Sequence, residues 1–108
     1  MNLGEVMRQR ALEPHDVENL TDVAAPNVYA MKSGNRIMGS KTAAKLGQAL
    51  NVDSDVLRVG NLSSAMKQAM KRGDPHAVLT AARSIVEIAE KRTMTPDSER
   101  PSERIFMR

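Results

Sequence analysis

Cysteine and tryptophan are absent from this chain of 108 residues, and its large aromatic residues are Tyr29 and Phe106 alone. Without cysteine there is neither a disulfide framework nor a thiolate metal site, which fits a reducing cytoplasm. Proteins that hold single-stranded nucleic acid stack its bases on aromatic side chains, and two rings are too few for such a platform. If the partner is a nucleic acid, we therefore expect duplex DNA.

Long apolar runs and catalytic constellations are also missing. No stretch has the length of a signal peptide or of a membrane span, so we expect a cytoplasmic protein with no membrane contact. His15 and His76 each begin a helical stretch, and neither belongs to a nucleophilic triad, a metal-ligand spacing or a glycine-rich phosphate loop. We expect no enzyme activity, no cofactor and no metal.

A long acid-free stretch is the most informative feature that is present. Residues 23–52 contain no Asp or Glu, although Asp22 and Asp53 stand directly beside them. The same stretch carries four cations, which are Lys32, Arg36, Lys41 and Lys45. A surface without carboxylates attracts a polyanion such as a phosphate backbone. The alternative is that chance has produced an ordinary solvated face.

The pattern of apolar residues predicts an all-α protein. Ala, Leu, Val and Met supply the core, and they recur at helical spacing. We expect helices at about residues 2–11, 14–21, 26–33, 41–51, 53–60, 63–72 and 75–92. Gly60 should close the fifth helix, and Leu20 should point inward from the second. This division gives a domain at residues 1–60, a C-terminal helical pair at 61–92 and a flexible, disordered tail at 93–108.

The N-terminal part resembles the Xre/Cro-repressor-like (lambda-repressor-like) family of helix-turn-helix DNA-binding domains. The segments that carry the resemblance are residues 3–10 (LGEVMRQR) and 45–57 (KLGQALNVDSDVL), together with Val28, Met31 and Gly34. The resemblance covers about residues 3–58 and implies a five-helix domain. The chain departs from the pattern at Glu18, where a small residue is usual, and at Asp22, where the turn normally has Gly. Asp tolerates the left-handed conformation that such a turn requires.

The resemblance implies that helix 26–33 enters the major groove of DNA and that the chain is a transcriptional regulator, most simply a repressor. Asn27 would pair with an adenine edge, and Tyr29 and Ala30 would contact a thymine methyl group. Exposed cations and polar groups near this helix would hold phosphates and fix the register. The expected DNA-binding residues are Ala25, Pro26, Asn27, Tyr29, Ala30, Lys32, Ser33, Asn35, Arg36, Ser40 and Lys41.

The last expected helix is apolar over more than half of its circumference, which is too much for docking against one neighbour. Monomers rarely expose such a surface, so we expect a homodimer. The expected interface residues are Val78, Leu79, Ala82, Ile85, Val86 and Ala89. Two alternatives stay open. The helix could pack back onto its own chain, or the protein could be a protein-binding or antitoxin-like module whose C-terminal helices bind a protein partner.

Overall fold

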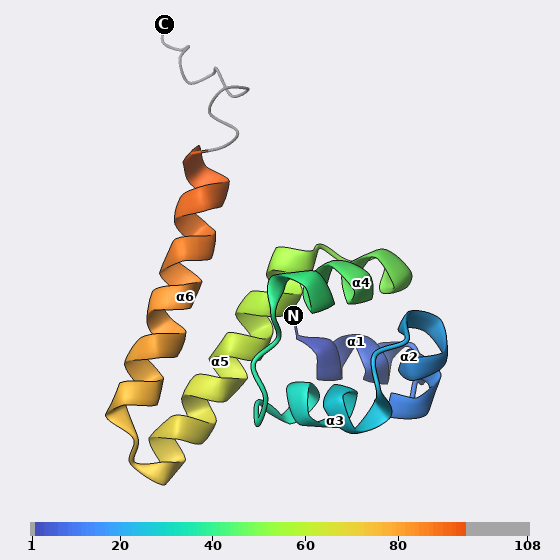
Figure 1. Ribbon diagram of the computed structural model, residues 1–108, viewed down its shortest axis with the longest axis horizontal. Coiled ribbons are helices and arrows are strands. Elements are labelled where there is room, and N and C mark those ends of the chain that lie inside the picture. Colours follow the sequence, from blue (N-terminus) through green and yellow to red (C-terminus); the bar gives the residue numbers. More distant parts are fainter. Residues whose placement is uncertain (1, 95–108) are drawn as a thin grey trace, which may run out of the picture.

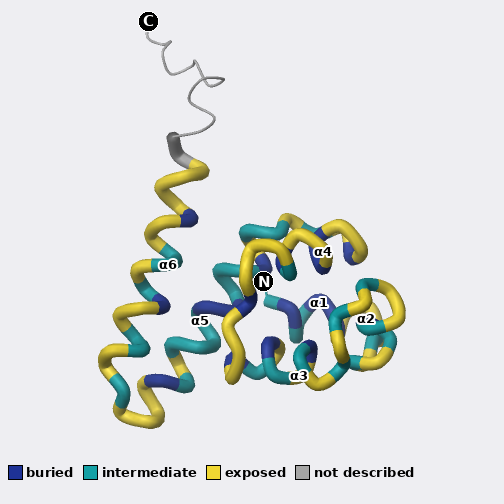
Figure 2. Tube along the Cα trace, viewed as in Figure 1, coloured by how far each residue is buried: buried dark blue, intermediate teal, exposed yellow. Residues whose placement is uncertain are grey.

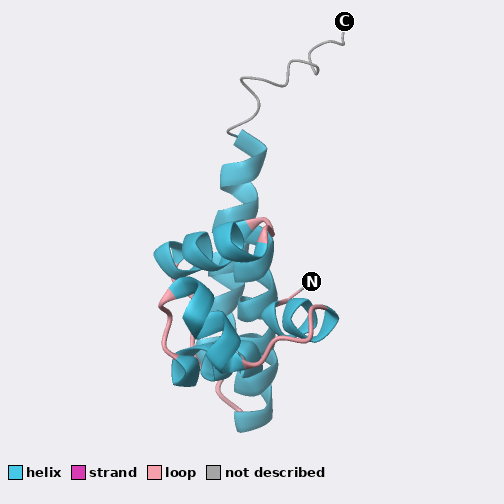
Figure 3. Cartoon of the chain, turned by 90° about the vertical axis from the view of Figure 1, so that its right-hand side faces the viewer, coloured by secondary structure: helices cyan, strands magenta, loops and turns pink. Residues whose placement is uncertain are grey.

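A computed structural model describes residues 2–94 of the chain, and these residues form helices and connections without a strand (Figures 1 and 3). The helices are α1 (Leu3–Gln9), α2 (Pro14–Thr21), α3 (Ala25–Ser33), α4 (Ser40–Leu50), α5 (Ser54–Arg72) and α6 (Pro75–Met94). The all-α prediction is confirmed. The tail predicted from residue 93 overlaps the end of α6 by two residues and otherwise lies outside the described part of the chain.

Several helices begin where capping chemistry predicts. At α1, the Asn2 side chain accepts a hydrogen bond from the Glu5 amide, and the Glu5 carboxylate accepts one from the Asn2 amide. The Asp53 carboxylate accepts from two amides of the first turn of α5, and Asp74 accepts from the amide of Ala77 in α6. Each such bond satisfies an amide that lacks a partner inside its own helix.

The expected break at Gly60 is wrong. Helix α5 runs without interruption from Ser54 to Arg72 and joins the two helices that the sequence suggested there. A glycine inside a helix costs roughly 1 kcal/mol relative to alanine. Leu57, Asn61 and Leu62 are buried on both sides of it, and this packing outweighs the local preference. The described part of the chain therefore has six helices in place of the expected seven.

The main core lies among α1, α2, α3, α4 and the first turns of α5 (Figure 2). Its buried members are Leu3, Val6, Met7, Val17, Val28, Met31, Met38, Ala43, Leu46, Leu50 and Leu57. The expectation that Leu20 points inward is wrong, because this side chain is 56 % exposed. Val17 is the buried residue of α2, and the helical turn of 3.6 residues places Leu20 about 60° around the helix from it.

Helices α5 and α6 form an antiparallel hairpin beside this domain (Figure 1). A second, smaller core of Leu62, Ala81 and Ile88 holds them together, with Val59, Met66 and Ile85 packed against it. At the far end of the hairpin, the Arg92 guanidinium donates to both carboxylate oxygens of Asp53, at 3.0 and 2.9 Å. One face of α6 is thus covered by α5 of the same chain.

Candidate nucleic-acid interface

Helices α2 and α3 meet through a tight turn at Asp22. This residue has a φ of 67°, so the expected left-handed conformation is confirmed. Its amide donates to the Glu18 carbonyl at 2.8 Å, and the Glu18 carboxylate accepts from the amide of Ala25 at 3.2 Å. Glu18 therefore caps the first turn of α3, whose own N-cap, Ala24, has no side-chain acceptor. Sequence reasoning saw Glu18 only as a departure and missed this role.

Helix α3 directs one face into the core and leaves the opposite face to solvent. Val28 and Met31 are buried, and the hundred-degree step between helical residues places the opposite face at four positions. These positions are Pro26, Tyr29, Ala30 and Ser33. None of them is buried, and Tyr29 is 61 % exposed. The face is therefore available to a partner, and Tyr29 is its largest side chain.

Asn27 and Lys32 border this face on opposite edges, because five residues turn an α-helix through roughly 140°. Asn27 is half-buried, whereas Lys32 is exposed. The stem of Lys32 lies against α1, where a Cβ added to Gly4 would be 3.2 Å from its Cγ. Its ammonium group lies 5.8 Å from the centroid of the Tyr29 ring. The expected base reader, Asn27, thus stands at an edge of this face, and Tyr29 is the most exposed large side chain on it.

The expected phosphate contacts fall into two groups. Asn35 and Arg36 follow α3 directly, and both are exposed. Ser40 and Lys41 are also exposed, but they begin α4, at the other end of the connection formed by residues 34–39 (Figure 1). The structure brings the first group to the C-terminal end of α3 and places the second group away from it.

The connection after α3 is fixed by one buried polar side chain. Asn61 of α5 is 1 % exposed. Its amide nitrogen donates to the carbonyls of Met31 and Arg36, both at 2.9 Å, and its amide oxygen accepts from the Met38 amide at 2.7 Å. Gln68, also on α5, donates to the Ser33 carbonyl at 3.2 Å. The sequence does not reveal the roles of Asn61 and Gln68, because the fifth helix that it predicts ends at Gly60. A helix continued past Gly60 would have predicted Asn61 to be buried, because it lies one turn after Leu57.

Gly34 closes α3 as the sequence indicates, with a φ of 87°. Besides this left-handed backbone conformation, Gly34 packs closely against α5. A Cβ at this position would lie 2.6 Å from the backbone carbon of Ser64, a distance that real Cβ atoms do not reach. The end of α3 therefore touches α5 backbone to backbone, and the position of α3 relative to the hairpin is fixed.

The cations of the acid-free stretch differ from those of the hairpin in their pairing. Lys32, Arg36, Lys41 and Lys45 are exposed, and within residues 2–94 none of them has a carboxylate partner. Arg92 instead pairs with Asp53 and Asp55. The hydrogen bond from Arg92 is the main reason that the pKa of Asp53 lies below its usual value. These four cations of α3, α4 and the connection between them are therefore not neutralised by an ion pair within residues 2–94.

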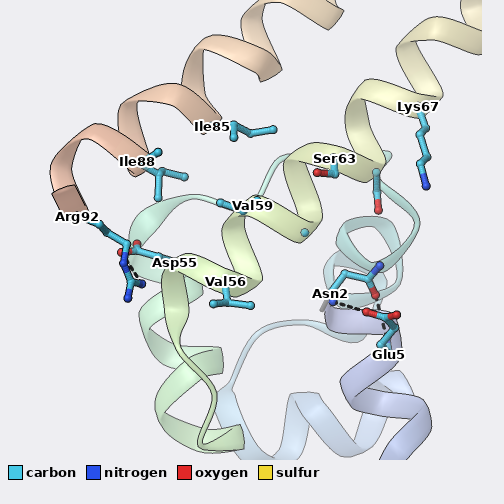
Figure 4. A pocket seen from close by; sticks show the side chains of 13 residues that line it. Asn2, Glu5, Asp55, Val56, Val59, Ser63, Lys67, Ile85, Ile88 and Arg92 are labelled. Atoms are coloured by element: carbon cyan, nitrogen blue, oxygen red, sulfur yellow. Dashed lines mark hydrogen bonds and ion pairs between the residues drawn. The ribbon is translucent and has the colours of Figure 1, made fainter.

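The expected dimer-interface residues have two different environments. Ile85 packs against the small core shared with α5 and with Ala89 lines a groove of about 530 Å³ between α5 and α6 (Figure 4). Leu79 and Val86 are each 53 % exposed, and Val78 and Ala82 are half-buried. The apolar arc is thus divided between contacts within the chain and an exposed stripe.

Other kinds of site find little support in the described part of the chain. Its His, Asp and Glu residues form no group of three that could hold a metal ion. None of its helices combines the length and hydropathy needed to cross a bilayer. The His15 ring lies 3.5 Å from the Asp16 carboxylate at the start of α2, where His15 is exposed and Asp16 is half-buried. Comparisons with models of protein families, with curated proteins and with solved structures found no match.

Proposed function

We propose that this chain binds duplex DNA in a sequence-specific manner and regulates transcription, as a repressor of the Xre/Cro-like kind. The observation that carries the proposal is the placement of α3. Its outer face is open to solvent, α2 braces it through the left-handed turn at Asp22, and the stretch around it has exposed cations and no acid. A major groove admits a helix presented in this way.

The side chains of α3 suggest how bases would be read. Tyr29 and Ala30 offer apolar contact to thymine methyl groups, and the Tyr29 hydroxyl can donate to a base edge or a phosphate. Asn27, at the edge of this face, can pair with the N6 and N7 atoms of adenine. Lys32 and Arg36 would hold phosphates and set the register, without reading sequence.

A single α3 would cover only a few base pairs, and specific binding by such domains commonly uses two copies one helical turn apart. The exposed stripe of α6 offers a way to join them. We therefore propose that the chain acts as a homodimer through α6. The stripe has its exposed members at Leu79 and Val86.

Charge reversal tests this proposal. The variant Lys32→Glu with Arg36→Glu should lose binding to duplex DNA at low ionic strength, because two phosphate contacts become repulsive. The control is Arg8→Glu with Lys91→Glu, which makes the same change of net charge at exposed positions of α1 and α6 that lie away from the outer stripe of α6. Retention of a fluorescent duplex would be measured for both. Equal binding by the two variants would remove α3 from the interface.

A protein-binding or antitoxin-like module is the second candidate, and exposed apolar side chains favour it. Met70 is 66 % exposed beside Leu79 in a hollow at the turn between α5 and α6. Under this reading the hairpin would bind a protein partner, and DNA binding would be weak or secondary. An intact sample that ignores duplex DNA of every sequence at low ionic strength would favour this candidate over the first.

A further inference from the structure

The end of α5 and the start of α6 carry a second group of basic side chains, which lies far along the chain from the acid-free stretch. Its members are Lys67, Lys71, Arg72 and His76, and all four are exposed. Lys67 and Lys71 are one helical turn apart on α5, and His76 lies in the first turn of α6. We call these four residues the basic ridge.

Two hollows connect the basic ridge to the end of α3. The first, of about 330 Å³, has Ser33 of α3 on one wall and Lys67, Gln68 and Lys71 on the other. The second, of about 410 Å³, lies between Asn35 and Ile37 of the connection and the hairpin residues Arg72, His76 and Thr80. No carboxylate belongs to the lining of either hollow.

The position of the basic ridge relative to α3 is fixed. The Gln68 amide donates to the Ser33 carbonyl at 3.2 Å, and Asn61 holds the carbonyls of Met31 and Arg36. In Figure 1 α1 lies above α3, so the exposed face of α3 is directed downward. The turn between α5 and α6 projects in the same downward direction, past the end of α3.

The charges of the basic ridge are largely uncompensated. Lys67 and Lys71 have no carboxylate partner within residues 2–94, and Arg72 makes only a long, exposed contact of 3.8 Å with Asp74. An exposed pair of this kind gains little from its contact. The His76 ring has no hydrogen-bond partner in the same part of the chain. These side chains are free to meet an anion.

We propose that the basic ridge holds phosphates of duplex DNA beside the base pairs that α3 reads. This inference rests on the proposed function and extends it to a second contact outside the helix-turn-helix. Cations that meet phosphates add affinity and salt dependence but no information about sequence. The α5–α6 hairpin would then serve DNA binding directly, in addition to any role in joining two copies.

The test compares the salt dependence of duplex binding in the full chain and two variants. Lys71→Gln with Arg72→Gln removes two charges from the basic ridge. Arg8→Gln with Lys91→Gln removes two exposed charges, one from α1 and one from α6, that line neither hollow. Each phosphate contact contributes ~0.9 to the slope of log affinity against log salt. We expect the first variant to lower the slope by about 1.8 for each bound chain, which is about 3.6 for a bound dimer, and the control to leave it near the parent value.

Two further readouts make the outcome unambiguous. Ethylation of phosphates outside the selected motif should interfere with binding by the parent and not by the Lys71→Gln, Arg72→Gln variant, while both select the same motif. If the parent binds DNA but both variants keep the parent's slope of log affinity against log salt, the proposed role of the basic ridge is overturned and the proposed function stands. A change of selected motif would also overturn the phosphate role. If the parent binds no duplex at all, both proposals fall together.

Discussion

At the scale of single residues, the position of the end of α3 depends on the side chains of Asn61 and Gln68 and on the lack of a side chain at Gly34. Asn61 satisfies the Met31 carbonyl in the last turn of α3 and two backbone groups of the connection that follows it. Gln68 adds a bond to the last residue of α3. Gly34 allows α3 to approach the backbone of α5. Because unpaired buried polar groups are costly, Asn61 makes this part of the surface one rigid unit with the hairpin.

The two left-handed glycines provide a matched test of that contact. Gly34 and Gly73 have similar φ values, 87° and 72°, but a Cβ on Gly73 would meet nothing within 4 Å. We expect Gly73→Ala to cost about 1–2 kcal/mol, the usual penalty for a left-handed residue with a Cβ. Gly34→Ala should cost about 1–3 kcal/mol more because of overpacking. Urea denaturation measures both, and equal losses would show that the approach to Ser64 is not tight.

At the scale of elements, α5 connects the two halves of the described chain. Its first turns close the main core, and its remainder supports α6. The ion pair between Arg92 and Asp53 then joins the end of α6 to the start of α5. The hairpin is therefore held at both ends, by the turn at Gly73 and by this pair.

This ion pair gives a pH dependence whose sign follows from Asp53. The pKa of Asp53 is lowered in the folded chain, mainly by the hydrogen bond from Arg92. Because this pKa is lowered by folding, the ionised carboxylate stabilises the fold at any pH above 3.8, the pKa of Asp53 in the unfolded chain. The stabilisation is lost as the pH falls through the lower pKa that Asp53 has in the folded chain. Both side chains are about half exposed, so the effect should be small.

We expect Arg92→Gln to lower the urea midpoint modestly at pH 6. The difference from the parent should begin to shrink as the pH falls below about 3.8 and disappear below the lowered pKa of Asp53 in the folded chain. Lys91→Gln is the control, because it removes an adjacent exposed charge of α6 and leaves both Arg92 and Asp53 in place. A difference between parent and Arg92→Gln that persists unchanged at pH 3 would assign the loss to packing and not to the ion pair.

Local signals were sufficient for most helix ends and insufficient where distant packing decides. Pro14, Asp53 and Asp74 mark helix starts by their own chemistry, and the sequence predicts all three. Gly60 resembles a helix end locally, and only the burial of its neighbours shows that the helix continues. The residues expected to bind DNA are all at least partly exposed, but the separation of Ser40 and Lys41 from α3 depends on the path of the connection.

At the scale of the whole molecule, the described chain is elongated, with principal extents of 50 × 35 × 22 Å. The domain that presents α3 lies at one side, and α6 lies at the other (Figure 1). This separation would leave the outer stripe of α6 open for a second copy while α3 met the proposed DNA. The two proposed surfaces do not compete for space.

Association through α6 is tested by its exposed stripe. We expect the intact chain to sediment as a dimer at tens of micromolar, because burying Leu79 and Val86 removes apolar surface from water. Leu79→Glu with Val86→Glu should convert it to a monomer and weaken DNA binding without unfolding the chain. Thr80→Glu with Glu87→Gln changes exposed polar positions of the same helix and should leave the dimer intact. A parent that sediments as a monomer contradicts this association.

Selection of bound sequences from a random duplex pool, at low ionic strength, tests the central claim most directly. If α3 reads the major groove in a paired assembly, the selected sequences will share an inverted repeat. Its half-sites will lie about 10 base pairs apart, centre to centre. Asn27→Ala should then relax the preference at one position of each half-site. A folded, intact chain that enriches no sequence from the pool would contradict the account.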